Sequence, residues 1–112
     1  MKIAIPVAGN KLCMHFGHCE VFAFFEIDED GKSIKNRVDV QPPAHEPGVL
    51  PKWVGEQGAS IVLAGGMGQR AQELFGQNGV KVIVGVHETD PQKAVLDYIN
   101  NSLQTGNNVC DH

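Results

Sequence analysis

Two short apolar runs, at residues 60–64 and 80–86, constrain the fold of this chain more than any other feature. The first run does not alternate apolar with polar residues, and we interpret both runs as strands covered on both faces. A segment with helically spaced apolar residues follows each run, and we expect these residues to face inward. They are Ala71, Leu74 and Phe75 after the first run and Ala94 and Val95 after the second. Strands joined through helices pair in parallel through right-handed crossovers, which predicts an α/β protein.

Typical capping residues give the bounds of these two helices. The turn at 65–68 precedes the first helix, and Asn78 with Gly79 closes it. Asp90 and Pro91 are a typical N-cap and first residue for the second helix, which we expect to continue until Gly106.

The first half of the chain predicts three further strands and one helix. Strands are expected at 1–7, 20–27 and 33–40, and a turn at 28–31 makes the last two an antiparallel hairpin. Loops are expected at 8–19 and at the proline-rich segment 41–48. A helix with Trp53 on its apolar side follows and ends near Gly58. The chain is thus predicted to be a single domain, 1–112, with a three-layer α/β/α architecture and an aperiodic tail at 107–112.

Composition excludes several classes of protein. The 112 residues are 42% hydrophobic and 20% charged, as in ordinary globular domains. A net charge of −4, with scattered Lys and Arg, argues against nucleic acid as a partner. No run approaches the roughly 20 apolar residues of a membrane span, and three cysteines leave a disulfide framework incomplete. We therefore expect a cytoplasmic protein with reduced thiols and no membrane association.

Cysteine and histidine gather in two loops and the tail. The residues concerned are Cys13, His15, His18, Cys19, His45, Cys110 and His112, and only His87 lies apart from them. Thiolate and imidazole are ligands for zinc, copper and iron-sulfur clusters. The spacing of Cys13 and Cys19 matches neither a zinc ribbon nor a ferredoxin, which favours an open site built from loops.

Simpler interpretations of the same residues stay open. A cysteine is often only a small buried apolar residue, His15 could anchor its loop and His45 could cap the following helix. A nucleophilic Cys-His pair has no identifiable oxyanion site. A redox pair of Cys13 and Cys19 lacks the helix N-terminal position that lowers a thiol pKa.

The turn at 65–68 could bind an anion. Gly65, Gly66, Met67 and Gly68 follow a buried strand and open a helix, where backbone N–H groups and the helix dipole favour negative charge. Arg70 could add a charged contact. A tight turn followed by a solvated arginine is the alternative interpretation.

Three motifs together resemble a known family. The sequences CMHFGHC at 13–19, PPAHEPG at 42–48 and AGGMG at 64–68 are similar to those of the dinitrogenase iron-molybdenum cofactor biosynthesis family. This family includes the NifX-like and NafY-like carriers and the C-terminal domain of NifB. The resemblance implies a ribonuclease H-like fold, with a five-stranded mixed sheet in the order 3-2-1-4-5 and strand 2 antiparallel.

The resemblance also implies a function without catalysis, namely binding and delivery of a metal-sulfur cluster or its precursor. The family's H-F-G element corresponds to His15, Phe16 and Gly17, and its proline-loop histidine to His45. Some small members resemble the orange protein that carries a molybdenum-copper sulfide, so iron-molybdenum, iron-sulfur and molybdenum-copper cargoes all stay open. The expected partners are cluster donor and acceptor proteins, and we expect a monomer or weak homo-oligomer. A zinc-binding or metal-free regulatory scaffold is the second hypothesis, and a thiol redox protein the third.

Overall fold

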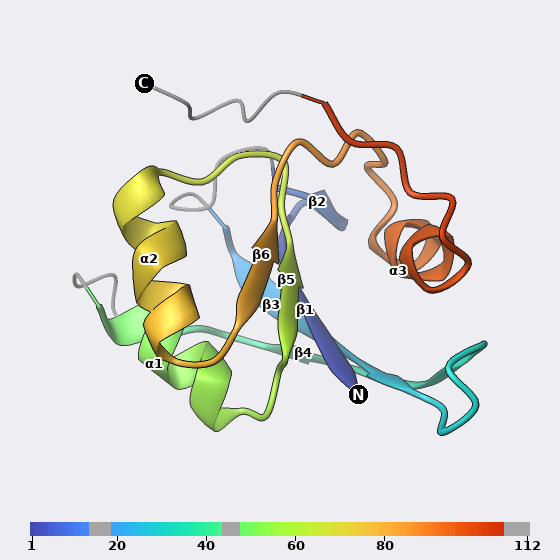
Figure 1. Cartoon of the computed structure of the whole chain (residues 1–112), viewed down its shortest axis with the longest axis horizontal. Coiled ribbons are helices and arrows are strands. Elements are labelled where there is room, and N and C mark those ends of the chain that lie inside the picture. The colour runs from blue at the N-terminus through green and yellow to red at the C-terminus, as the bar shows by residue number, and fades with distance from the viewer. Residues whose placement is uncertain (14–18, 44–47, 107–112) are drawn as a thin grey trace.

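The computed structural model describes residues 1–13, 19–43 and 48–106, which form a mixed sheet and three helices (Figure 1). The strands are β1 (Lys2–Ala8), β2 (Lys11–Leu12), β3 (Val21–Ile27), β4 (Ile34–Val40), β5 (Ile61–Leu63) and β6 (Lys81–Ile83). The helices are α1 (Val49–Glu56), α2 (Gln69–Gln77) and α3 (Pro91–Ile99). The predicted α/β class is confirmed. Within these residues no helix has the length and apolarity to cross a membrane.

The sheet has β1 at its centre. Its strand order is β4-β3-β1-β5-β6, and β2 pairs with β1 outside this path. The strands on one side, β3 and β4, form the predicted antiparallel hairpin, and β3 also runs antiparallel to β1. On the other side, β5 and β6 run parallel to β1, as expected of strands joined through helices. The sheet therefore has one strand more than the five we predicted, because β2 lies in the segment expected to be a loop.

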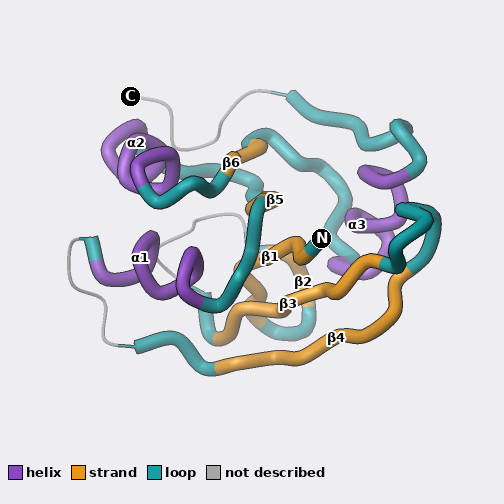
Figure 2. Tube along the Cα trace, turned by 60° about the horizontal axis from the view of Figure 1, so that its bottom comes forward, coloured by secondary structure: helices purple, strands orange, loops and turns teal. Residues whose placement is uncertain are grey.

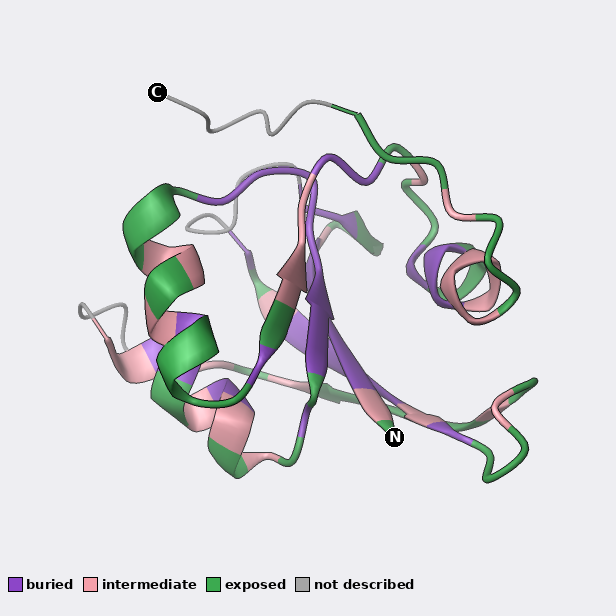
Figure 3. Ribbon diagram, viewed as in Figure 1, coloured by how far each residue is buried: buried purple, intermediate pink, exposed green. Residues whose placement is uncertain are grey.

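Successive strand residues point to opposite faces, so the sheet supports two separate cores. Ala4, Phe22, Phe24 and Val62 pack with buried residues of α1 and α2 on one face. Ile3, Ile5, Phe25 and Leu63 pack with Ala94 and Val95 of α3 on the other. Figures 1 and 3 show this arrangement, with buried central strands lying between α1 and α2 on one side and α3 on the other.

An aromatic cluster fixes α1 against the sheet. Trp53 makes edge-to-face contacts with Phe22 and Phe24, at centroid distances of 5.7 and 5.6 Å. Such contacts add about 0.5–1.5 kcal/mol to the apolar burial. The helix ends close to the predicted Gly58, which has a φ of 89° and whose N–H donates to the Gly55 carbonyl.

The caps of the later helices agree with the sequence in part. The Asp90 side chain accepts hydrogen bonds from the N–H groups of Gln92 and Lys93, as predicted for the N-cap of α3. The predicted end of α3 at Gly106 was wrong, because α3 stops at Ile99 and Asn101 takes a φ of 60°.

Two predictions of burial also need correction. The strand expected at 80–86 is shorter than predicted, because β6 spans only Lys81–Ile83. Its residues are partly exposed because β6 lies at an end of the sheet. In α2, Phe75 is fully buried, but Ala71 and Leu74 are only half-buried.

Close backbone packing holds the segment after α3 against the sheet. The Gly106 N–H donates to the Gly85 carbonyl at 2.7 Å, and Val86 forms a β-bridge with Thr105. Gly85 has a φ of 75°, and a Cβ there would collide with the Gly106 backbone. The Gly85 N–H in turn donates to the Gly65 carbonyl at 3.0 Å. The segment is thereby fixed beside the turn that follows β5.

Gly85→Ala is expected to destabilise the protein by about 2–3 kcal/mol, since it combines a left-handed conformation with a backbone collision. The measurement is urea unfolding. Gly76→Ala is the matched control, because Gly76 lies in α2 with open space around it. Alanine in place of this helical glycine should raise the free energy of unfolding by about 0.5–1 kcal/mol. Equal effects of the two substitutions would contradict this account of Gly85.

Candidate metal-binding site

The segment with Cys13 begins with a tight hairpin between β1 and β2. Ala8 is opposite Lys11 and Val7 is opposite Leu12, so only Gly9 and Asn10 form the turn. These two residues have φ values of 59° and 64°. Two consecutive positive φ values define a type I′ turn, whose twist matches that of the paired strands. The chain therefore reverses immediately after β1.

Backbone hydrogen bonds tie both cysteines to the end of β1. The Cys13 N–H donates to the Pro6 carbonyl, and the N–H of Glu20, next to Cys19, donates to the Val7 carbonyl, each at 2.8 Å. The Glu20 carboxylate also accepts a 2.7 Å hydrogen bond from the Gly9 N–H. Adjacent carbonyls of β1 thus hold the segments on which Cys13 and Cys19 lie.

Both cysteines are thiols buried in the core under α1 and α2, with exposed fractions of 8% for Cys13 and 7% for Cys19. They share this core with Met67 and Phe22. Burial, with a further contribution from the charge of nearby Cys13, raises the pKa of the Cys19 thiol from 9.0 to about 11. The two sulfur atoms are therefore close enough to interact electrostatically.

The glycine turn after β5 lies at the same end of the sheet (Figure 1). Gly65, Gly66 and Met67 are buried, and Met67 has no exposed surface. The Ala64 N–H donates to the Ile83 carbonyl, while the Gln72 side chain donates to the Met67 carbonyl, both at 2.9 Å. The turn is thus firmly held and brings a thioether into the core that contains the two thiols.

Gly68 and Arg70 face solvent instead. Gly68 is the N-cap of α2 and is exposed. The Arg70 side chain is 77% exposed, and its guanidinium lies 3.8 Å from the Glu73 carboxylate. Such an exposed pair contributes little to stability.

Five of the predicted ligands, His15, His18, His45, Cys110 and His112, lie outside the described residues. Within the described residues, no three Cys, His, Asp or Glu side chains form a group that could hold a metal ion. His87 is exposed and lines a separate polar hollow with Glu88 and Lys93.

This arrangement argues against thiol catalysis by Cys19. Nucleophilic and redox-active cysteines need a lowered pKa, whereas that of Cys19 is raised. A soft metal can still displace the thiol proton, because metal binding couples to deprotonation of its ligands. The two cysteines also lie near the carboxyl end of β1, at the edge where open α/β sheets commonly bind ligands.

Sequence reasoning missed the hairpin that positions Cys13. The available signal was the Gly9-Asn10 pair between β1 and Lys11, which is typical of a two-residue turn. The strand after the turn, Lys11–Leu12, has only two residues, which made this signal weak.

Comparisons with known proteins agree with the fold and indicate a family. Residues 1–101 match the family described as "Dinitrogenase iron-molybdenum cofactor". The uncharacterized protein MJ0580 of Methanocaldococcus jannaschii is 34% identical over 87 residues, which cover 73% of this chain and 72% of that protein.

Two solved structures extend the comparison. The crystal structure of PH0822 has a TM-score of 0.85 and 32% identity, covering 95% of this chain and 96% of its own. The apo form of the orange protein from Desulfovibrio gigas has a TM-score of 0.69 and 19% identity, covering 96% and 93% of the two chains. At that identity, the orange protein supports the fold alone.

Alkylation of Cys19 tests its environment. Since a raised pKa lowers the thiolate fraction at a given pH, Cys19 should react with iodoacetamide at pH 8 roughly a hundredfold more slowly than an unperturbed thiol. The rate should rise with pH until the solution reaches the pKa of about 11. The measurement is peptide mass spectrometry against time, with a short cysteine peptide as control. A Cys19 rate equal to that of the peptide would contradict the assigned burial.

Proposed function

The chain belongs to the dinitrogenase iron-molybdenum cofactor family, and we propose that it binds and delivers a metal-sulfur cluster or its precursor without catalysing a reaction. Family membership supports a role related to this cofactor. The more specific proposal depends on the chemistry of the residues at one end of the sheet.

The close pair of buried thiols, Cys13 and Cys19, is the observation that carries the proposal. Thiolates are the protein ligands of iron-sulfur clusters and of copper(I). The thioether of Met67 in the same core is a further soft donor. Hard oxygen ligands, which magnesium or calcium would require, are missing from this core among the residues described.

The remaining ligands are proposed from the sequence. His15 and His18 lie between the two cysteines, His45 follows a proline pair, and Cys110 and His112 follow the segment fixed by Gly85. Imidazoles and a third thiolate would complete the coordination of a cluster. The backbone N–H groups of the turn at 65–68 would face its negative charge. The exposed Arg70 side chain would have to turn away from Glu73 to add a charged contact.

We propose that the site is held by backbone hydrogen bonds at two points of β1 and is otherwise built from loops. Such a site suits the transfer of a cluster better than its permanent binding. The anchors at Pro6 and Val7 are backbone hydrogen bonds, which do not use the sulfur atoms that would bind the cargo. Burial of Cys19 favours its protonated form, so the return of a proton to this thiol would assist release. We further propose a ribonuclease H-like layout, a cytoplasmic location, and donor and acceptor proteins as partners.

The cargo is an iron-molybdenum, iron-sulfur or molybdenum-copper species. Molybdenum-copper species are among the candidates because the sequence motifs resemble those of small family members for which such a cargo is implied. Two thiols would equally suit a single zinc ion in a regulatory domain, and the metal content distinguishes these possibilities.

Anaerobic reconstitution with iron, molybdenum or copper and sulfide tests the proposal. The protein should become coloured and hold stoichiometric metal and sulfide, and Cys13→Ala or Cys19→Ala should lower metal retention at least tenfold, as for the loss of one ligand. Metal analysis after gel filtration and visible absorption are the measurements.

Val54→Ala is the matched control, because Val54 is fully buried in the same core but carries no sulfur. It should lose comparable packing and keep the cargo. A colourless protein with one zinc would favour the regulatory alternative, and a protein that stays free of metal and sulfide would refute cluster binding.

A further inference from the structure

The outer edge of β4 is the most unusual surface among the described residues. This seven-residue strand ends the sheet, and its only neighbour in the described sheet is β3 (Figure 2). Five consecutive residues, 35–39, are exposed. A strand edge presents a row of backbone donors and acceptors that can pair with another chain.

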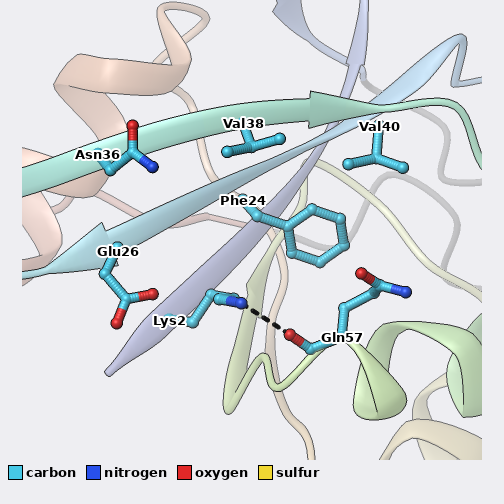
Figure 4. Close-up of a pocket in the computed structure, with 7 residues that line it drawn as sticks. All are labelled: Lys2, Phe24, Glu26, Asn36, Val38, Val40 and Gln57. Carbon is cyan, nitrogen blue, oxygen red and sulfur yellow. Dashed lines mark hydrogen bonds between the residues drawn. The ribbon is translucent and has the colours of Figure 1, made fainter.

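One face of β4 is apolar where solvent would favour polar side chains. Val38 is 49% exposed, and with Val40 and Phe24 it lines an open hollow of about 170 Å³. Figure 4 shows Asn36, Val38 and Val40 in a row along β4 above this hollow. The Lys2 ammonium closes its far side through a 2.8 Å hydrogen bond to the Gln57 carbonyl.

The opposite face of β4 carries opposite charges at alternate positions. The Arg37 guanidinium donates to both carboxylate oxygens of Asp39, at 2.8 and 3.1 Å. It also lies 5.2 Å from the centre of the Phe25 ring. Arg37 and Asp39 therefore flank Val38 with charges of opposite sign.

Among pairings centred on the exposed residues 35–39, this pattern makes β4 complementary to itself in a single register. Antiparallel pairing of two copies places residues of the same face opposite each other, so a symmetric pair must be centred on one residue. Centring on Lys35, Arg37 or Asp39 places a charge opposite its own copy, and centring on Asn36 places Lys35 opposite Arg37. Like charges at such positions are destabilising. Centring on Val38 instead places Arg37 opposite Asp39 and Val38 opposite Val38.

We propose that β4 is an interface with a second copy of this chain, formed by antiparallel pairing centred on Val38. The pair extends the sheet across a twofold axis, exchanges the Arg37–Asp39 contact between copies and covers the exposed Val38. A single strand edge is smaller than the roughly 1,600 Å² of a standard interface, so the dimer is weak and reversible. Since β3 separates β4 from β1, Cys13 and Cys19 of each copy remain outside the interface.

Charge reversal tests the register by sedimentation. The apparent molecular mass of the wild-type protein should rise towards that of a dimer as the protein concentration approaches about 1 mM, as expected of a transient interface. Arg37→Asp and Asp39→Arg should each remain monomeric, because each places like charges opposite each other. An equimolar mixture of the two variants should form heterodimers, since opposite charges then face each other at both positions. A monomeric wild type, or variants that dimerise alone, would overturn the proposal.

Cross-linking provides a second measurement that does not depend on affinity. In a Cys110→Ser background, Val38→Cys should form an intermolecular disulfide under mild oxidation, because the paired Cβ atoms would lie about 4.5–5.5 Å apart. Asn36→Cys and Val40→Cys should cross-link poorly alone and efficiently when mixed. Equal cross-linking at all three positions would indicate random collision and would overturn the proposed register.

Discussion

The attachment of the cysteine segments to β1 is the constraint on which the candidate site depends. Successive carbonyls of one central strand, those of Pro6 and Val7, accept hydrogen bonds from both ends of the segment between the two cysteines. The type I′ turn at Gly9 and Asn10 makes this possible, because it returns the chain to β1 within two residues. A central strand of the sheet thus holds the segments on which Cys13 and Cys19 lie.

The apolar surroundings of these thiols have two chemical consequences. They raise the pKa of Cys19, which keeps this thiol protonated and lowers its reactivity towards oxidants. They also exclude water from the sulfur atoms, so a soft metal that displaces the protons meets little competition from oxygen ligands. A thiol enzyme would require the opposite environment. The same core holds Met67 at the turn after β5, so two segments distant in the sequence supply sulfur to one region.

Much of the fold follows from local patterns in the sequence. The unbroken apolar run at 60–64 predicts β5, the acidic turn at 28–31 predicts the β3–β4 hairpin, and Asp90-Pro91 predicts the start of α3. The errors concern features that depend on tertiary contacts. The apolar sequence of β6 does not reveal that it lies at a sheet end, and Asn101 rather than Gly106 takes the left-handed conformation that follows α3. For the site, residue types indicate the ligand chemistry, but only the fold shows that Cys13 and Cys19 are buried as a pair.

Anomalous diffraction from crystals of the loaded protein tests the central claim most directly. We expect a metal peak at one end of the sheet, within about 2.3 Å of the Sγ atoms of both Cys13 and Cys19, the usual metal–thiolate distance. Data collected on either side of each metal edge would identify iron, molybdenum or copper in the same crystal. A metal peak bound only by other residues, with both cysteines still packed in the apolar core, would contradict the account.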